Sequence, residues 1–316
     1  MARLNRPVVY VALQEFCEVD DRPRCALLGA GVELRENTLG RRLRREEMID
    51  VLQDARAVLA GVEPYDAQVL IGLPHLQCIS RCGVGTDSID LEAARQRGLA
   101  VYTTPDEVVA PTAQLTVAMM LALARNIPLH LADARQGLWK KRLGILLSEW
   151  TIGLVGFGRI GRAVEQSLRS FGPRVLVADP ALTPADLPTG AELRALDRLL
   201  TEADLVSLHL SRPKADGPLL GPQEFACMKP GSYLVNTARG FLVDERALYE
   251  ALTSGRLAGA ALDVFEQEPA TGPLTRLPQV LCTPHVASFA RASRAAMELR
   301  CAQNVLEWLV RSRNGR

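Results

Sequence analysis

His285 stands in a sequence setting that suits acid–base chemistry. It is one of four histidines, and it follows the short apolar run Val280–Cys282. A turn at the end of a strand is where α/β sheets place groups that contact ligands. An imidazole suits proton transfer because its unperturbed pKa is about 6.5. Glu268 lies 17 residues upstream, and a carboxylate on the second ring nitrogen would orient the imidazole and stabilise its charged form.

A guanidinium follows another predicted strand. Arg239 comes directly after the segment Tyr233–Ala238. Its planar fork can bind a carboxylate and a carbonyl oxygen together. Hydride transfer to or from a carbinol carbon needs a proton donor or acceptor, a group that polarises the carbonyl and, for an acid, an anchor for the carboxylate. Arg239, Glu268 and His285 therefore predict a dehydrogenase site.

A glycine loop of the form GxGxxG spans Gly156–Gly161. A predicted strand, Ile152–Val155, precedes it, and a predicted helix, Arg159–Ser170, follows it. In such a loop the first glycine permits the tight turn, the second allows close approach to a pyrophosphate, and the third lets helix and strand pack closely. The helix N-terminus then offers free N–H groups to the phosphates. We therefore predict a dinucleotide site, with Gly156, Gly158 and Gly161 in these three roles.

The acid that ends the next predicted strand indicates which dinucleotide binds. Asp179 follows Val175–Ala178 and lies 21 residues after Gly158, near the spacing of a ribose-binding acid. Its carboxylate would accept hydrogen bonds from both ribose hydroxyls and would repel a 2′-phosphate. Pro180 stands where an NADP enzyme often has an arginine. The sequence therefore favours NAD as the cofactor.

Composition excludes several classes of protein. The chain has 316 residues, 48% hydrophobic and 23% charged, with a net charge of +1. This balance gives no basic footprint for nucleic acid or an anionic membrane. The N-terminus lacks an apolar secretory region, and the longest apolar stretch, Val117–Ala124, is too short to span a bilayer. The seven cysteines are scattered without zinc spacing, so we expect free thiols, no metal site and a cytoplasmic protein.

Short β-branched runs alternate with helix-like segments, which predicts βαβ units and parallel sheets. A first series has strands at Val8–Val11, Ala57–Ala60, Gln77–Ser80 and Leu99–Tyr102, and helices at Glu46–Asp54 and Leu91–Gln96. A second series adds strands at Leu205–Leu208, Tyr233–Asn236 and Gly259–Leu262, and a helix capped by Asp244 and stopped by Gly255. Two long helices, Thr112–Ala124 and Ser293–Val310, join the two predicted α/β domains.

Five segments, taken in order, resemble the D-isomer-specific 2-hydroxyacid dehydrogenases of the phosphoglycerate dehydrogenase-like kind. They cover about residues 75–310 and comprise Arg81–Asp87, Gly156–Gly161 with Asp179, Asn236–Gly240, Leu262–Phe265 with Glu268–Pro269, and Thr283–His285. The resemblance implies an NAD-dependent oxidoreductase that transfers a hydride between nicotinamide and a D-2-hydroxy or 2-oxo acid, phosphorylated in some relatives.

The resemblance also implies an architecture and a set of site residues. Two doubly wound parallel-sheet domains, Rossmann and flavodoxin-like, would enclose an interdomain cleft: a substrate domain of residues 1–104 and 288–316, and an NAD domain of residues 105–287. His285 would be the acid–base group, Glu268 its partner and Arg239 the anchor of the substrate. Further cofactor contacts would come from Arg159, Ile160, His209, Leu210, Thr237, Ala238 and Asp263, and substrate contacts from Arg81, Gly83 and Val84. Homodimers are usual in this family, and we expect no C-terminal regulatory domain.

Some positions depart from the family pattern and leave the substrate open. Asp106–Val108 stands where Asn-Ser is common, Gln114 where Glu is common, and Ser211–Pro213 in place of Pro-Leu-Thr. Lys140–Arg142 forms either a solvated basic turn or part of a site for an anionic substrate. Asp263 either satisfies a buried loop or contacts the nicotinamide.

Alternative functions share the same fold. One is a related dehydrogenase acting on glyoxylate, hydroxypyruvate, a phosphonate, phosphite or formate. Formate enzymes resemble a His–Gln pair, against which Glu268 argues, and phosphite enzymes carry a lysine where Val84 stands. Another is a non-enzymatic NAD(H)-sensing corepressor-like protein, which a turnover assay would separate from both enzymes.

Overall fold

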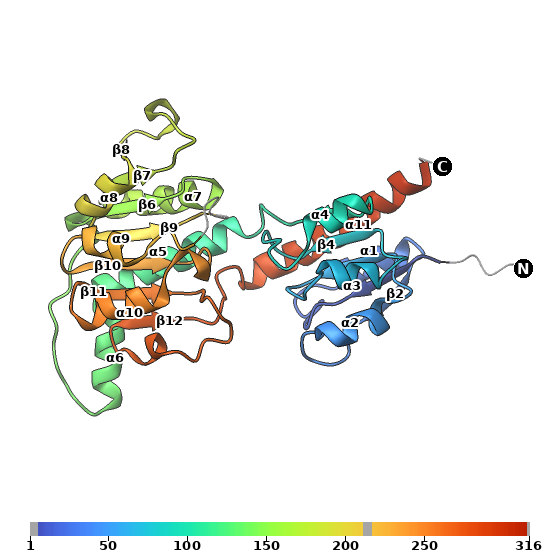
Figure 1. The fold of residues 1–316 in the computed structure, drawn as a ribbon, viewed down its shortest axis with the longest axis horizontal. Coiled ribbons are helices and arrows are strands. Elements are labelled where there is room, and N and C mark those ends of the chain that lie inside the picture. The colour runs from blue at the N-terminus through green and yellow to red at the C-terminus, as the bar shows by residue number, and fades with distance from the viewer. Residues whose placement is uncertain (1–5, 211–216, 315–316) are drawn as a thin grey trace, which may run out of the picture. The chain divides into compact units, whose positions relative to one another are not determined.

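The computed structural model describes residues 6–210 and 217–314. The chain divides into two compact units: unit 1 comprises Met1–Val108 and Ser288–Arg316, and unit 2 comprises Val109–Ala287. Each unit has one parallel sheet flanked by helices (Figure 1), so the predicted α/β fold with two parallel sheets is confirmed. The division falls at the start of helix α5 (Val109–Ala124), whereas the predicted substrate domain ended at residue 104. The roles of the units as substrate and NAD domains stay predictions.

Unit 1 has a five-stranded sheet in the order β2-β1-β3-β4-β5, the strand order of flavodoxin-like folds. Its strands are β1 (Val8–Val11), β2 (Glu33–Glu36), β3 (Ala57–Ala60), β4 (Cys78–Arg81) and β5 (Ala100–Tyr102), and its helices are α1 (Arg22–Gly29), α2 (Arg45–Leu52), α3 (Ala67–Ile71), α4 (Leu91–Gln96) and α11 (Arg291–Asn314). The order reverses between β1 and β3, so the loops that follow them diverge at the carboxyl edge of the sheet.

Local sequence explains these elements. β3 reads Ala-Val-Leu-Ala and is buried along its whole length, as expected for a central strand covered on both faces. Asp66 and Asp90 cap α3 and α4 by accepting the N–H groups of Val69 and Ala93. The C-terminal helix α11 closes one face of this sheet with buried Cys301 and its neighbours on the same side, Met297, Val305 and Trp308.

Unit 2 has a seven-stranded sheet in the order β12-β11-β10-β9-β6-β7-β8. Its strands are β6 (Thr151–Val155), β7 (Arg174–Ala178), β8 (Ala191–Leu193), β9 (Leu205–Leu208), β10 (Ser232–Asn236), β11 (Leu257–Leu262) and β12 (Val280–Cys282), and its helices are α5 (Val109–Ala124), α6 (Ile127–Arg135), α7 (Arg159–Leu168), α8 (Leu196–Glu202), α9 (Pro222–Cys227) and α10 (Glu245–Thr253). Short 3₁₀ turns η1 (Leu147–Glu149), η2 (Arg169–Phe171), η3 (Pro184–Asp186), η4 (Gly240–Leu242) and η5 (Pro273–Arg276) complete it.

The order of this sheet determines where ligands bind. All pairs are parallel, and β6 has β9 on one side and β7 on the other. The connections from β6 therefore run in opposite directions along the sheet, which opens a crevice at its carboxyl edge. Every predicted cofactor and catalytic residue of this unit follows the carboxyl end of one of these strands.

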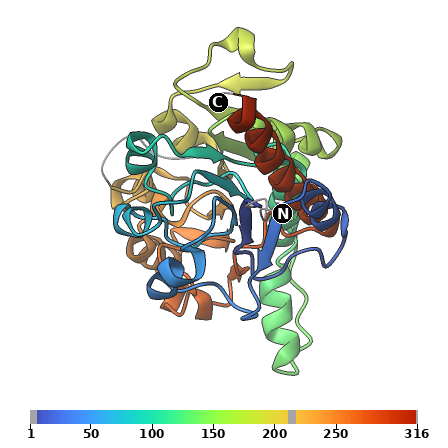
Figure 2. The same ribbon diagram turned by 90° about the vertical axis from the view of Figure 1, so that its right-hand side faces the viewer.

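Helices α5 and α6 differ sharply in burial. α5 packs against α7, β10 and β11 and buries Met119, Met120 and Leu123, as its apolar sequence predicts. In α6 no residue is buried, and the helix extends away from the sheet of its own unit (Figures 1 and 2). No single described helix is long and apolar enough to span a membrane, although α5 and α6 together, with a bend of 65° between them, reach that length and composition.

Candidate active site

His285 and Glu268 form a hydrogen-bonded pair in unit 2. The Nδ1 atom of His285 lies 2.9 Å from Oε2 of Glu268. The other carboxylate oxygen of Glu268 accepts the N–H of Phe265 at 3.2 Å, which fixes the carboxylate on its loop. The imidazole is 44% exposed and the carboxylate 31%. The arrangement leaves Nε2 of the ring, the nitrogen opposite the carboxylate, as the atom that can exchange a proton with a ligand.

Asp263 holds the turn that carries His285. Its side chain is fully buried, and its carboxylate accepts hydrogen bonds from the hydroxyl of Thr283 at 2.5 Å and from the N–H groups of Val286 and Ala287, each at 2.8 Å. Its carbonyl oxygen accepts the N–H of His285 at 2.8 Å. With this support His285 adopts a φ of 55°, in the left-handed region that non-glycine residues rarely occupy. These contacts show a satisfied buried loop, and the contact of Asp263 with the nicotinamide stays a prediction.

Arg239 follows β10, the strand next to β11. The side chain of Asn236 fixes this loop. Its Nδ2 donates to the backbone carbonyl of Arg239 at 2.8 Å, and its Oδ1 accepts the backbone N–H of Ala238 at 3.0 Å. Nη1 of Arg239 donates to the carbonyl of Ala238 at 2.7 Å. Gly240 permits the closest approach, since a Cβ there would lie 1.9 Å from the carbonyl carbon of Phe265. The absence of a side chain thus brings the Arg239 loop against the Glu268 loop.

The glycine loop has the features that a pyrophosphate site requires. Gly156 has a φ of 89°, and a Cβ on Gly161 would lie 2.5 Å from the carbonyl oxygen of Gly156, so helix and strand meet as closely as predicted. A Cβ on Gly158 would meet no atom within 4 Å, which leaves the approach to the loop open. Arg159 and Ile160 begin α7 at this point. These residues fit the dinucleotide that the sequence predicts.

Asp179 lies beside the glycine loop at the end of β7. Its Oδ2 accepts the N–H of Phe157 at 2.9 Å, and its Oδ1 accepts the N–H of Ala181 at 3.0 Å. Each oxygen keeps lone-pair capacity for a further donor. The carboxylate is therefore oriented by the loop and can still accept ribose hydroxyl groups.

His209 packs on the other side of the same loop. A Cβ on Gly156 would lie 2.9 Å from the carbonyl oxygen of His209 and from Cδ2 of Leu210. Both ring nitrogens of His209 are buried and have no hydrogen-bond partner among the described residues. Burial lowers the pKa of His209 to about 4, so the ring is neutral at physiological pH. The departure at Ser211–Pro213 lies outside the described residues.

Thr237 and Ala238, which lie between Asn236 and Arg239 in the chain, are both buried. The hydroxyl of Thr237 lies 2.8 Å from that of Thr116 on α5, which itself donates to the carbonyl of Thr112 at 2.8 Å. This chain of hydroxyl groups ties the loop after β10 to α5. Thr116 was not singled out from the sequence, and Asn236 and Gly240 were named only as the ends of the segment Asn236–Gly240, without roles of their own. The run Asn-Thr-Ala-Arg-Gly, with an amide before and a glycine after the arginine, is the signal that could have identified the last two.

In unit 1 the predicted substrate residues lie in the loop after β4. The N–H of Gly83 donates to the hydroxyl of Thr104 at 2.7 Å, and the carbonyl of Gly83 accepts the N–H of Thr104 at 3.0 Å. The N–H of Gly83 is therefore already used. Val84 is 42% exposed, and its N–H has no partner among the residues described. The N–H of Val84, together with the side chain of Arg81, is what this loop offers an anion.

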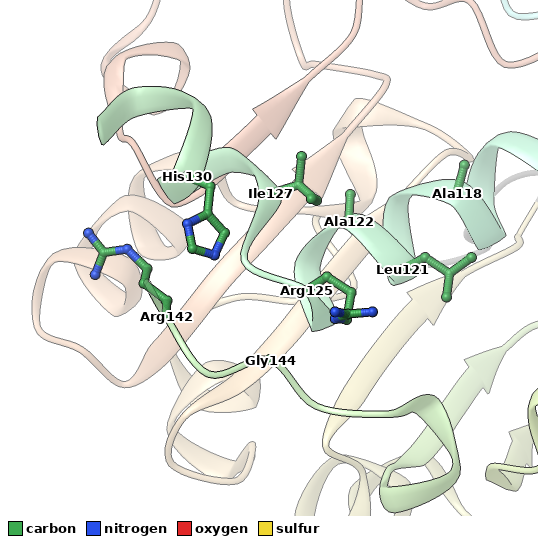
Figure 3. A pocket seen from close by; sticks show the side chains of 8 residues that line it. All are labelled: Ala118, Leu121, Ala122, Arg125, Ile127, His130, Arg142 and Gly144. Atoms are coloured by element: carbon green, nitrogen blue, oxygen red, sulfur yellow. The ribbon is translucent and has the colours of Figure 1, made fainter. Parts of the chain in front are cut away.

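The basic segment Lys140–Arg142 follows helix α6, apart from the strand ends that carry the predicted catalytic residues. Arg142 pairs with Asp133 of α6 at 2.7 Å. With Arg125 and His130 it lines a groove of about 640 Å³, whose lining also includes the apolar residues Ala118, Leu121, Ala122 and Ile127 (Figure 3). Lys140 and Lys141 are exposed. None of the described residues that line this groove is acidic, and Asp133, the partner of Arg142, lies outside the lining.

Comparison with known proteins decides the family. The model for the D-isomer specific 2-hydroxyacid dehydrogenase, NAD binding domain, matches residues 117–287. The hydroxypyruvate reductase of Thermotoga maritima is 36% identical over 80% of this chain and 84% of its own length. This chain belongs to the D-isomer specific 2-hydroxyacid dehydrogenase family. The resemblance stated from the sequence is thereby confirmed.

Other members of the family differ in length and in named substrate. The D-3-phosphoglycerate dehydrogenase of Mycobacterium tuberculosis is 39% identical over 83% of this chain. The match covers 50% of that protein, so the chain spans about half the length of the phosphoglycerate dehydrogenases it matches. The D-lactate dehydrogenase of Aquifex aeolicus, solved with NAD and lactic acid, superimposes with a TM-score of 0.82 at 26% identity, covering 96% of this chain and 95% of that one.

The low pKa of His209 predicts a specific pH dependence of stability. The unfolded chain protonates this histidine below about pH 6.5, whereas the folded chain keeps it neutral down to about pH 4. Its contribution to the free energy of unfolding is therefore complete above pH 6.5 and is lost as the pH falls toward 4, by about 3 kcal/mol. The free energy of unfolding, measured with urea at several pH values between 4 and about 6.5, should fall more steeply with falling pH for the unmodified protein than for His209→Gln. His75→Gln, at an exposed position, is the control, and parallel curves for His209→Gln would contradict the assignment.

Proposed function

We propose that this protein transfers a hydride between NAD(H) and a D-2-hydroxy or 2-oxo acid. The observation that carries the proposal is the pair formed by His285 and Glu268, 2.9 Å apart, on a loop that packs against the loop of Arg239. Family membership supports the same reaction. A nicotinamide ring supplies or accepts the hydride when the cofactor is bound.

The side chains of unit 2 divide the remaining chemistry. Nε2 of His285 donates a proton to the substrate oxygen during reduction and accepts it during oxidation. The carboxylate of Glu268 stabilises the charged imidazole and fixes its Nδ1–H toward itself. The guanidinium of Arg239 binds the substrate carboxylate and polarises its carbonyl oxygen. In unit 1, Arg81 and the N–H of Val84 bind the carboxylate, while Gly83 supports this loop through Thr104.

For the cofactor we propose NAD in preference to NADP. The glycine loop with Arg159 and Ile160 binds the pyrophosphate, and the oriented carboxylate of Asp179 binds the ribose. His209, Leu210, Thr237 and Ala238 line the site. Asp263 holds the turn of His285 and also contacts the nicotinamide, since its Oδ2 accepts the N–H of Ala287 and keeps lone-pair capacity for a further donor.

The substrate is a small anionic 2-oxo acid. A panel of hydroxypyruvate, glyoxylate, phosphohydroxypyruvate and phosphonopyruvate, assayed with NADH, distinguishes them. Absence of turnover with all four, together with intact NADH binding, would favour the corepressor-like alternative.

We also propose that the chain forms a homodimer through the projecting arm at residues 127–146. Trp139 is 94% exposed and Leu143 is 96% exposed on this arm, and exposed apolar clusters of this kind mark interaction surfaces. The groove at the base of the arm is lined in part by small and apolar residues, among them Ala118, Leu121 and Ala122. A two-fold axis would place the arm of each copy in the groove of the other, so that one interface covers both surfaces.

The proton relay predicts different effects for two neighbouring acids. His285→Gln should lower kcat at least about 100-fold, the usual share of general acid–base catalysis, while NADH binding by fluorescence stays intact. Glu268→Gln should slow reduction roughly tenfold or more, because a hydrogen bond to a charged group is worth about 1.5–3 kcal/mol. Glu266→Gln changes an exposed acid in the same loop and should leave kcat unchanged. Equal rates in Glu268→Gln and Glu266→Gln would show that Glu268 has no part in proton transfer.

The charge of Asp179 predicts the choice of dinucleotide. Asp179→Asn keeps an acceptor for the loop but removes the charge that repels a 2′-phosphate. The ratio of kcat/KM for NADPH to that for NADH should rise roughly tenfold or more, with a larger loss of NADH affinity in Asp179→Ala. Asp197→Asn removes an exposed charge from α8 and serves as the control. Equal use of both cofactors by the unmodified protein would refute this role.

The dimer proposal predicts that charge on the arm separates the subunits. Trp139→Glu and Leu143→Glu should convert a dimer to a monomer, measured as mass by light scattering after size exclusion. Ile71→Glu replaces a side chain on α3 that is 74% exposed and should leave the dimer intact. A monomeric unmodified protein, or arm variants that remain dimeric, would refute the interface.

A further inference from the structure

Two buried threonines join distant parts of unit 2. Thr116 lies on α5, and Thr237 lies in the loop after β10, 121 positions further along the chain. Both side chains are buried, and their hydroxyl oxygens are 2.8 Å apart. A buried hydroxyl costs free energy unless it has a hydrogen-bond partner. The proposed function gives Thr237 a place beside the cofactor and leaves Thr116 without a role.

The direction of this hydrogen bond follows from the single proton of each hydroxyl group. Thr116 donates its proton to the carbonyl oxygen of Thr112, which is 2.8 Å away and one turn earlier in α5. The oxygen of Thr116 can then only accept, so Thr237 is the donor in the bond between the two hydroxyl groups. Thr116 is thus held by its own helix, and it holds Thr237 in turn.

The loop that carries Thr237 is closed by its own hydrogen bonds. The side chain of Asn236 bonds to the backbone of Ala238 and of Arg239, at 3.0 and 2.8 Å. Gly240 packs against the backbone of the loop after β11, which fixes one side of the loop. The hydroxyl of Thr237 attaches the same loop to α5. Together these contacts prevent the loop from turning about the end of β10, so the backbone of Arg239 keeps one position.

Helix α5 is a firm support for this loop. It packs against α7, β10 and β11, and its buried residues Met119 and Met120 share one apolar cluster with Val164 of α7 and Val235 of β10. Helix α7 begins at the glycine loop. Through α5, the loop of Arg239 and the glycine loop are therefore supported by the same element.

We propose that Thr116 is a positioning residue whose hydroxyl holds the loop of Thr237, and through it the guanidinium of Arg239, where the carboxylate and the carbonyl oxygen of a 2-oxo acid bind. The inference rests on the proposed function, in which Arg239 binds the substrate. A planar guanidinium reaches two oxygen atoms only in a narrow range of orientations, and a small displacement of such a group costs catalytic efficiency. The glycine loop and Asp179 follow β6 and β7, so most of the affinity for NADH should not depend on Thr116.

Substitutions can separate the hydroxyl of Thr116 from the shape of its side chain. Thr116→Val keeps the shape and leaves the hydroxyl of Thr237 buried without its acceptor, whereas Thr116→Ser keeps the hydroxyl. Thr116→Val combined with Thr237→Val removes both hydroxyl groups and leaves neither unpaired, so it can be assayed even where Thr116→Val alone is too unstable. Thr253→Val on α10 is the matched control, because that hydroxyl donates within its own helix, to the carbonyl oxygens of Tyr249 and Glu250 at 2.9 and 3.2 Å.

The experiment measures kcat and KM for the best 2-oxo acid of the panel at saturating NADH, the Kd of NADH by fluorescence, and the thermal midpoint. In Thr116→Val we expect kcat/KM to fall on the order of tenfold, with the Kd of NADH within about twofold. The midpoint should fall by roughly 2–4 °C, because a buried hydroxyl loses its acceptor. Thr116→Ser should restore kcat/KM to within about twofold of the unmodified protein.

The double variant distinguishes positioning from stability. Its thermal midpoint should recover, because no hydroxyl of the pair is left unpaired, while its kcat/KM should stay low, because the bond between α5 and the loop is absent. Thr253→Val should leave kcat/KM unchanged.

Three outcomes would overturn the inference and leave the proposed function standing, given an active unmodified protein. One is an unchanged kcat/KM in Thr116→Val. Another is recovery of kcat/KM together with the midpoint in the double variant, because Thr116 would then act only through stability. The third is a loss of NADH affinity that accounts for the whole effect, because the loop of Arg239 would then be unaffected. Absence of turnover by the unmodified protein with every member of the panel would overturn the proposed function and this inference with it.

Discussion

The buried carboxylate of Asp263 is the group on which the arrangement of unit 2 depends most. It accepts three hydrogen bonds from the segment at residues 283–287, and these contacts satisfy a charge that would otherwise be costly in the interior. Through them a residue after β11 fixes the conformation of the turn after β12. The left-handed backbone of His285 follows from this constraint, and with it the direction of the imidazole toward Glu268. Glu268 lies on the loop that Asp263 begins, so both members of the pair share one anchor.

The parallel sheet places the other predicted site residues of unit 2 along its carboxyl edge as well. In the order β12-β11-β10-β9-β6-β7, successive strands end at His285, Asp263, Arg239, His209, the glycine loop and Asp179. Residues as far apart in the chain as Gly156 and His209 thereby become neighbours along one edge. Close backbone approach replaces side-chain contact at two places, Gly161 against Gly156 and Gly240 against Phe265. The glycines are therefore as important for bringing the loops together as the polar residues are for chemistry.

Sequence patterns predicted the parts of this arrangement that depend on local signals. The strands at Val8–Val11, Ala57–Ala60 and Leu205–Leu208 and the helix at Leu91–Gln96 have the predicted bounds, because buried parallel strands are continuous apolar runs and the helix has an aspartate cap. The two-residue pair of His285 and Glu268 was predicted from spacing and composition, and the structure brings these residues together. β2, with the polar sequence Glu-Leu-Arg-Glu, was missed because an edge strand carries no such apolar run. Helices α1 and α6 were missed because α1 has few apolar periodic positions and α6 buries none.

What the sequence could not provide was the purpose of buried polar groups. The three donors that Asp263 holds became known only in the structure. The same is true of the N–H of Gly83, a predicted substrate contact, which donates to Thr104. The ion pair of Arg294 with Glu298 is a further example in unit 1. Glu298 accepts from Arg294 at 2.6 Å and from the N–H of Cys17 at 2.8 Å, so it fixes the loop after β1 as Asp263 fixes the turn after β12. In both units, then, a buried carboxylate acts on loops from distant parts of the chain, and only the folded structure reveals which N–H groups and cations it holds.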